Sequence, residues 1–321
     1  MVVIFSHFAS GCFRHSVFSL SKIYNHHLLH YTFQNPIHNF SSTCLRFRTR
    51  VTNSSEAICI EENGGSSGAA DVIRSPNLVA LEYADLNLPL ICEGVPYSRT
   101  EVGNIRVRQH VNPLSSTLSV PAEVPDWNDV FRDSSLPLIV DIGCGSGRFL
   151  LWLAKRNFGS NYLGLEIRKK LVTRANFWAK ELNLLNSHFM FANATISFQQ
   201  LASSYPGPLV LVSVLCPDPH FKKRHHKRRV LQKPLVDSIV DNLASGGQVF
   251  VQSDVHEVAV DMRNQFDIVS DMLHIDTVDP NFGCDPDGWL VSNPMGIRTE
   301  REVHAELEGA KMYRRMYQKR T

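Results

Sequence analysis

The sequence of 321 residues has little net charge, little cysteine and no long hydrophobic run. Lys and Arg number 33 against 31 Asp and Glu, which excludes a uniformly basic protein that binds nucleic acid over its whole surface. No apolar run reaches the roughly 20 residues that a membrane-spanning helix requires, so we expect no membrane association. The 7 cysteines are scattered and never spaced Cys-x-x-Cys. This spacing argues against a disulfide framework or a metal site and favours a reducing compartment.

Acidic residues are absent from residues 1–55, which are rich in Ser, Thr and aromatic residues with sparse Arg. This composition is typical of an organelle transit peptide. The alternative is a disordered N-terminus that carries no address. The small residues NGGSSGAA at 63–70 indicate a linker. Residues 1–70 are therefore predicted to be a transit peptide and disordered linker.

Strand and helix patterns alternate from residue 136 onward. A helix is expected over 148–157, a second has Leu171, Ala175, Trp178 and Leu182 on one face, and a third covers 229–243 and ends at Gly246–Gly247. Short apolar runs predict buried strands. They cover residues 136–143, 161–167, 187–193, 208–215 and 247–254. This alternation predicts an α/β fold with a doubly wound, mostly parallel sheet and a ligand crevice at the carboxyl ends of its strands.

The first expected strand leads into DIGCGSG, with Gly143, Gly145 and Gly147 before the first helix. Such a loop lets the backbone approach a ligand closely at a helix N-terminus. The dinucleotide fingerprint has its third glycine one position later, where this chain has Arg148, and this argues against NAD. A generic phosphate loop or turn is the alternative reading of the glycines alone.

Three polar residues follow the ends of the expected strands. Asp141 lies two residues before the first glycine and suits a cationic or amino group rather than a pyrophosphate. Glu166 ends the second strand, where a carboxylate can bind two ribose hydroxyls, and Asn193 ends the third, near an adenine edge. The set predicts a site for S-adenosylmethionine.

A strongly basic segment follows the fourth strand. Asp218 lies between two prolines, which hold it on a stiff turn facing the same crevice. Six cations in eight residues then indicate a polyanionic ligand, although a solvated basic face or a localisation signal is the alternative. The segment contains Lys222, Lys223, Arg224, Lys227, Arg228 and Arg229, interleaved with His225 and His226.

These motifs together resemble the tRNA (guanine-N7-)-methyltransferase family, in its bacterial, cyanobacterial-type branch. The resemblance is carried by DIGCGSG, GLEIR at 164–168, PDPxxKKRHHKRR from residue 217 and QSD at 252–254. It extends from about residue 106 to residue 320. It implies a Rossmann-like class I S-adenosylmethionine-dependent methyltransferase, with residues 71–135 as an N-terminal extension and 136–321 as the catalytic domain.

The resemblance also implies roles for individual residues. Asp141, Glu166 and Asn193 would contact the cofactor, with Asp218 as the catalytic residue at the junction of cofactor and guanine. The implied substrate contacts are Lys222, Asp254, Thr299, Glu300, Arg301 and Glu302. The implied RNA contacts are Arg224, His225, His226, Lys227, Arg228 and Arg229.

The implied reaction is methyl transfer from S-adenosylmethionine to N7 of a guanine in tRNA, at G46 of the variable loop. The bacterial-type likeness implies a monomer or homodimer without an obligatory protein partner, and favours a chloroplast over a mitochondrion. Two other readings stay open at this point. One is a methyltransferase that acts on another RNA, a protein or a small molecule, and the other is a non-catalytic RNA-binding protein with the same fold.

Overall fold

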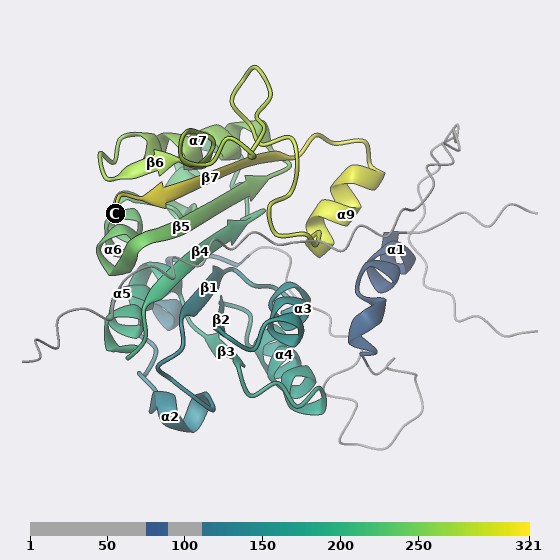
Figure 1. Cartoon of the computed structure of the whole chain (residues 1–321), viewed down its shortest axis with the longest axis vertical. Coiled ribbons are helices and arrows are strands. Elements are labelled where there is room, and N and C mark those ends of the chain that lie inside the picture. The colour runs from purple at the N-terminus through teal and green to yellow at the C-terminus, as the bar shows by residue number, and fades with distance from the viewer. Residues whose placement is uncertain (1–74, 89–110) are drawn as a thin grey trace, which may run out of the picture. The chain divides into compact units, whose positions relative to one another are not determined.

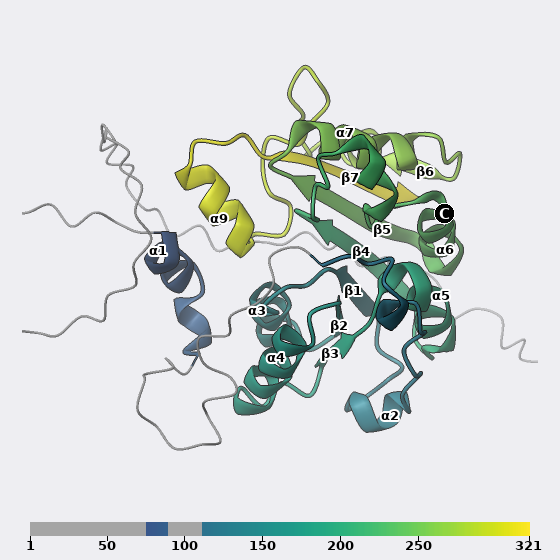
Figure 2. The same ribbon diagram turned by 180° about the vertical axis from the view of Figure 1, so that it is seen from behind.

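A computed structural model describes residues 75–88 and 111–321, so the expected transit peptide lies outside the described residues. The described residues form a seven-stranded sheet in the order β3-β2-β1-β4-β5-β7-β6 (Figures 1 and 2). Strands β1 to β5 are parallel, and β7 is antiparallel to both β5 and β6. The strands are β1 (Leu138–Ile142), β2 (Asn161–Glu166), β3 (Ser187–Phe191), β4 (Leu209–Leu215), β5 (Leu243–Ser253), β6 (Met272–His274) and β7 (Tyr313–Lys319).

Helices connect the parallel strands and cover the sheet. They are α1 (Ser75–Glu82), α2 (Trp127–Val130), α3 (Arg148–Arg156), α4 (Lys169–Glu181), α5 (Ala194–Ser204), α6 (Lys233–Asn242), α7 (His256–Asp267), α8 (Ile275–Val278) and α9 (Glu300–Leu307). Three short 3-10 helices are η1 (Ala84–Leu86), η2 (Ser116–Leu118) and η3 (Lys223–Arg228). The doubly wound, mostly parallel α/β fold expected from the sequence is confirmed.

The core lies on both faces of the sheet because side chains alternate along each strand. In β1, Leu138, Val140 and Ile142 pack in one hydrophobic cluster, and Ile139 packs in the other. The first cluster includes apolar residues of α5, α6 and α7, and the second includes those of α3 and α4. This two-sided cover explains why the central strands are continuous apolar runs.

The third expected helix is confirmed, but it begins later than expected and does not end at the glycine pair. Helix α6 begins at Lys233, and its last residue is Asn242, so the glycine pair belongs to β5. The pairing with β4 moves from Leu209 with Leu243 to Leu211 with Gln248, so residues 244–247 form a bulge. A bulge commonly uses glycine, because its backbone enters the left-handed region, as at Gly246 with φ +75°. The glycines therefore shape a strand and do not end a helix.

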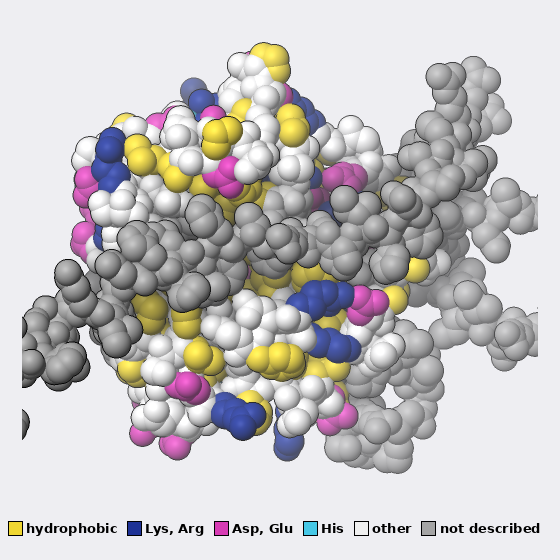
Figure 3. Space-filling model, in the orientation of Figure 1, with side chains coloured by type: hydrophobic (Ala, Val, Ile, Leu, Met, Phe, Trp, Pro, Cys, Tyr) yellow, Lys and Arg dark blue, Asp and Glu magenta, His cyan; other side chains and the backbone are white. Residues whose placement is uncertain are grey.

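Charge of both signs occurs among the described residues on the face drawn in Figure 3, where Lys and Arg lie among Asp, Glu and apolar side chains. Within the described ranges, none of the helices is long and apolar enough to cross a membrane. In the same part of the chain, no group of three His, Cys, Asp or Glu side chains is placed to hold a metal ion.

Gly147 allows α3 and α4 to approach β3 closely. Its φ is +81°, and a Cβ atom added there would lie 2.7 Å from the Ala175 Cβ atom and 2.8 Å from the Phe189 ring. Gly143 has the same kind of backbone, with φ +82°, but nothing lies within 4 Å of its added Cβ atom. Both glycines have left-handed backbone, but only Gly147 is closely packed against neighbouring side chains.

We therefore expect Gly147→Ala to destabilise the fold more than Gly143→Ala does. Both variants incur backbone strain of about 1–2 kcal/mol, and Gly147→Ala adds about 1–3 kcal/mol from overpacking. Urea denaturation followed by circular dichroism measures the two losses. Equal losses would show that the approach at Gly147 is not tight.

Candidate active site

A cavity of about 680 Å³ lies at the carboxyl ends of the parallel strands. Gly143 and Glu166 line it after β1 and β2, Asp218 lines it after β4, and Asp254 and Arg301 complete it beside β5. A doubly wound sheet binds its ligands at this edge. The volume is in the range of small-molecule and cofactor sites.

Asp141, an expected cofactor contact, is almost fully buried in β1 and does not itself line this cavity, whose lining includes the next residues Ile142 and Gly143. The Ser213 hydroxyl of β4 donates to its Oδ1 atom at 2.7 Å. Burial raises the pKa of Asp141 to about 7, against the opposing effect of that hydrogen bond. Removal from water disfavours the charged form, and a cationic ligand group nearby would favour it.

Glu166 ties the glycine loop to the end of β2. Its carboxylate accepts hydrogen bonds from the backbone N–H of Gly145 at 3.0 Å and from the backbone and guanidinium of Arg168 at 2.9–3.0 Å. Arg168 was not among the expected site residues, although it stands two positions after Glu166. Two donors on each oxygen occupy the acceptor sites of this carboxylate, so a ribose hydroxyl would bind it by displacing one of them, such as the Arg168 guanidinium.

Asn193 has a structural role besides the expected contact with the cofactor. Its Oδ1 atom accepts from Thr195, and its Nδ2 atom donates to the carbonyl oxygens of Pro113 and Leu118, each at 3.0 Å. Asn193 thus caps α5 and fastens the chain before the sheet to the cavity wall. It lines the cavity, and its contact with an adenine edge stays a prediction.

The turn that carries Asp218 is strained. Cys216 and His220 have φ of +51° and +45°, a region that costs residues other than glycine about 1–3 kcal/mol each. The backbone N–H of Cys216 donates to the Gln252 carbonyl oxygen at 2.7 Å, which fixes one end of the turn on β5. Asp218 itself lines the cavity, as expected, and its Oδ1 atom accepts from the backbone N–H of His220 at 3.3 Å.

Most of the expected cations lie on the surface beside the cavity. Lys222, Lys223, Arg224 and Lys227 are exposed, and Arg228 is partly buried and lines the cavity. His225 and His226 are partly buried in η3. Phe221, which was not an expected site residue, is exposed on the cavity rim.

Arg229 corrects the expectation that all these cations reach RNA. Its side chain is only 6% exposed and pairs with Glu257 at 2.8 Å and Asp261 at 3.2 Å. Both carboxylates belong to α7. A guanidinium already neutralised and enclosed by two carboxylates has no free edge for a phosphate group.

The residues from Thr299 to Glu302 point to four different places. Thr299 caps α9. Glu300 pairs with Arg148 and accepts from Ser146 in the glycine loop, and these contacts lower its pKa although burial alone would raise it. Arg301 pairs with Asp254 at the cavity.

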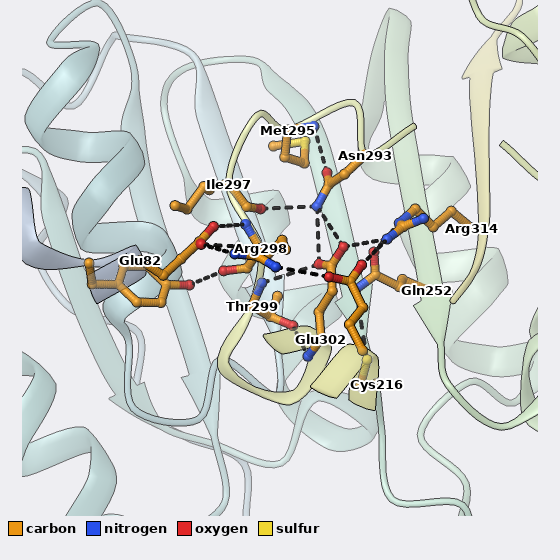
Figure 4. A network of polar contacts seen from close by, with 12 residues as sticks. Glu82, Cys216, Gln252, Asn293, Met295, Ile297, Arg298, Thr299, Glu302 and Arg314 are labelled. Carbon is orange, nitrogen blue, oxygen red and sulfur yellow. Dashed lines mark hydrogen bonds and ion pairs between the residues drawn. The ribbon is translucent and has the colours of Figure 1, made fainter. Parts of the chain in front are cut away.

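Glu302 corrects the expected substrate contact at this position. Its side chain is 0% exposed and forms an ion pair with Arg314 of β7. Gln252 and Asn293 also donate to its carboxylate, at 3.0 Å and 3.1 Å (Figure 4). The carboxylate thus joins β5, β7 and α9 inside the protein and turns away from a substrate.

The same region contacts α1, the first helix of the described residues. Arg298 pairs with Glu82 of α1 (Figure 4). The Tyr83 hydroxyl donates to the Arg298 carbonyl oxygen at 2.5 Å. Helix α1 is therefore attached to the segment that leads into α9. Neither α1 nor this attachment was expected from the sequence.

The fold and site together define a class I S-adenosylmethionine-dependent methyltransferase. A family model described as a putative methyltransferase matches residues 135–314. A tRNA (guanine-N(7)-)-methyltransferase of Synechococcus sp. is 48% identical over 65% of this chain and 82% of its own length. One of Synechococcus elongatus is 43% identical over 67% of this chain and 97% of its own. This chain belongs to the tRNA (guanine-N(7)-)-methyltransferase family.

Solved structures include a more distant neighbour. An rRNA methylase from Streptococcus thermophilus aligns with a TM-score of 0.37 at 11% identity, over 61% of this chain and 92% of that chain.

We expect Glu302→Ala to lower the free energy of unfolding by about 3–5 kcal/mol, because it leaves Arg314 buried without its principal partner. The matched control is Glu308→Ala, since the Glu308 side chain is 65% exposed and lies 3.8 Å from Arg301. That control should lose less than about 0.5 kcal/mol. Urea denaturation measures both, and similar losses would contradict a structural role for Glu302.

We also expect the buried carboxyl of Asp141 to make stability depend on pH. Its folded pKa of about 7 lies above the ordinary value of 3.8, so its protonated form stabilises the fold at low pH. That contribution is lost as pH rises from about 4 to about 7. Relative to Asp141→Asn, the cofactor-free protein should lose on the order of 2 kcal/mol between pH 5 and pH 7.5. Urea denaturation at both values tests this, and a constant difference would contradict it.

Proposed function

We propose that this chain transfers a methyl group from S-adenosylmethionine to N7 of a guanine in tRNA, and that the guanine is G46 of the variable loop. Membership of the family supports the reaction. The observation that carries it in the structure is the cavity, where Asp218 faces the same space as the glycine loop and is followed at once by the basic segment.

The described residues fit the cofactor. S-adenosylmethionine supplies an electrophilic methyl group on a cationic sulfonium. Asp141 below the glycine loop would hold its positive amino-acid end, and Glu166 would accept hydrogen bonds from its ribose. The left-handed backbone at Gly143 and Gly145 lets the loop approach it closely. Asn193 would lie at the adenine end of the cavity wall.

Methyl transfer requires alignment of the reacting atoms and stabilisation of the charge that forms on the guanine. Guanine N7 has an in-plane lone pair and no proton at neutral pH, so a strong general base is not needed. The protein must hold N7 in line with the methyl group and offset the positive charge that the ring gains. Asp218 and Asp254 line the cavity and can accept hydrogen bonds from the guanine N1–H and N2–H₂ groups. Lys222 can bind a phosphate group or the O6 edge.

The exposed cations of residues 222–228 would bind the tRNA backbone. Counterion release makes such contacts favourable and dependent on salt. Their place beside the cavity lets a nearly neutral chain attract RNA through a local field. This arrangement favours an RNA substrate over a protein or a small molecule.

One assay separates this proposal from the two other readings. The protein is incubated with bulk unmodified tRNA and labelled S-adenosylmethionine, and the RNA is then cleaved chemically at 7-methylguanosine. Cleavage at G46 supports the proposal. Label without such cleavage indicates another methylation, and cofactor-independent RNA binding without label indicates a binding protein.

We further propose that the chain works in a chloroplast as a monomer or homodimer without an obligatory protein partner. The likeness to cyanobacterial relatives supports a plastid, because plastids descend from cyanobacteria. The acid-free composition of residues 1–55 is consistent with import. Imaging residues 1–70 fused to a fluorescent protein tests the compartment, with a mitochondrial signal as the contrary result.

We expect Asp218→Ala to lower the rate of tRNA methylation about a hundredfold or more while preserving the fold, because the guanine loses its charge partner. Asp237→Ala is the control, since Asp237 is an exposed residue of α6. Methyl transfer to tRNA and circular dichroism measure the two effects. Near-normal turnover of Asp218→Ala would refute the catalytic role.

A further inference from the structure

The last cation of the basic segment makes a different kind of contact from the others. Besides its carboxylate partners on α7, the Arg229 guanidinium donates from Nε to the Pro219 carbonyl oxygen at 3.0 Å. Its Nη2 atom lies 2.8 Å from Glu257, and its Nη1 atom lies 3.2 Å from Asp261. Each edge of the planar fork therefore has its own partner.

The contact at Pro219 falls on the strained turn that carries Asp218. Left-handed backbone at Cys216 and His220 persists only where the surroundings hold it. One end of the turn is held by the hydrogen bond from Cys216 to Gln252 of β5. The hydrogen bond from the guanidinium holds the other end and connects it to α7.

We infer that Arg229 is a positioning residue, whose three-way contact with Pro219, Glu257 and Asp261 holds Asp218 in place for methyl transfer. The inference rests on the proposed function, because Asp218 is the catalytic residue there. The adjacent arginines Arg228 and Arg229 then have different roles. Both arginines line the cavity, but Arg228 is partly exposed and can reach RNA, whereas Arg229 is only 6% exposed and acts through the backbone of the turn.

The chemistry of arginine explains why lysine would not serve at this position. A guanidinium offers donors in a rigid plane, and an ammonium offers a single point of charge. Lysine at 229 could pair with a carboxylate of α7 and would then lose the bond to Pro219. A phosphate contact is less demanding, because lysine binds phosphate well as a point charge.

The test compares Arg229→Lys with Arg132→Lys in the full chain, because Arg132 is exposed before β1 and does not line the cavity. For Arg229→Lys we expect kcat for tRNA methylation to fall about tenfold to a hundredfold, because a misplaced catalytic group slows the reaction. Its KM for tRNA should stay within about twofold, because the net charge is unchanged. Arg132→Lys should keep both kcat and KM close to those of the unaltered protein. A raised KM with unchanged kcat in Arg229→Lys would overturn the inference.

A second measurement does not depend on activity. Hydrogen exchange of peptides that cover residues 216–221 should become faster in Arg229→Lys and stay unchanged in Arg132→Lys. If the unaltered chain does not methylate tRNA, the proposed function fails, and the exchange experiment still decides whether Arg229 holds the turn. Unchanged exchange in Arg229→Lys would overturn the inference.

A variant on the partner helix covers the case in which Arg229→Lys does not fold. The double change Glu257→Gln and Asp261→Asn keeps the arginine and weakens its anchor on α7. We expect a smaller fall in kcat than in Arg229→Lys, a nearly constant KM, and faster exchange over residues 216–221. Normal kcat together with normal exchange in this variant would count against the inference.

Discussion

The buried ion pair between Glu302 and Arg314 is the interaction on which the arrangement around the site depends. A carboxylate with no exposure cannot remain charged without partners, and Arg314, Gln252 and Asn293 supply them. Because Glu302 belongs to the first turn of α9, its fixed place also fixes its neighbours. Glu300 then reaches the glycine loop, and Arg301 reaches Asp254 at the cavity.

Much of the fold could be predicted from the sequence, because the five parallel strands are short apolar runs separated by helical patterns. The antiparallel strand β7, between β5 and β6, could not, since YRRMYQK has no apolar run and buries Arg314 and Arg315 through ion pairs. The bulge at residues 244–247 was also missed, because a glycine pair after a helix pattern reads equally well as a helix end. Such features depend on partners that are distant in sequence.

The site shows the same division. One cavity brings together four of the expected residues, namely Glu166, Asp218, Asp254 and Arg301. The first three lie at the ends of β2, β4 and β5, and Arg301 pairs with Asp254. Glu302 and Arg229 were misjudged for a common reason. A charged residue in a motif gives no sign of whether its charge is already matched inside the protein. That depends on α7 and β7, which meet these residues only after folding.

The hydrogen bonds from Asn193 to Pro113 and Leu118 show that the active site includes residues before the first strand. Val111, Pro113 and Leu114 precede the first strand by more than twenty positions, yet they form part of the cavity lining. The same stretch leads to Trp127 and Phe131, which pack in the core. A chain shortened to begin at residue 136 would keep the motifs by which the family is recognised. It would lose part of the wall of the cavity that these motifs line.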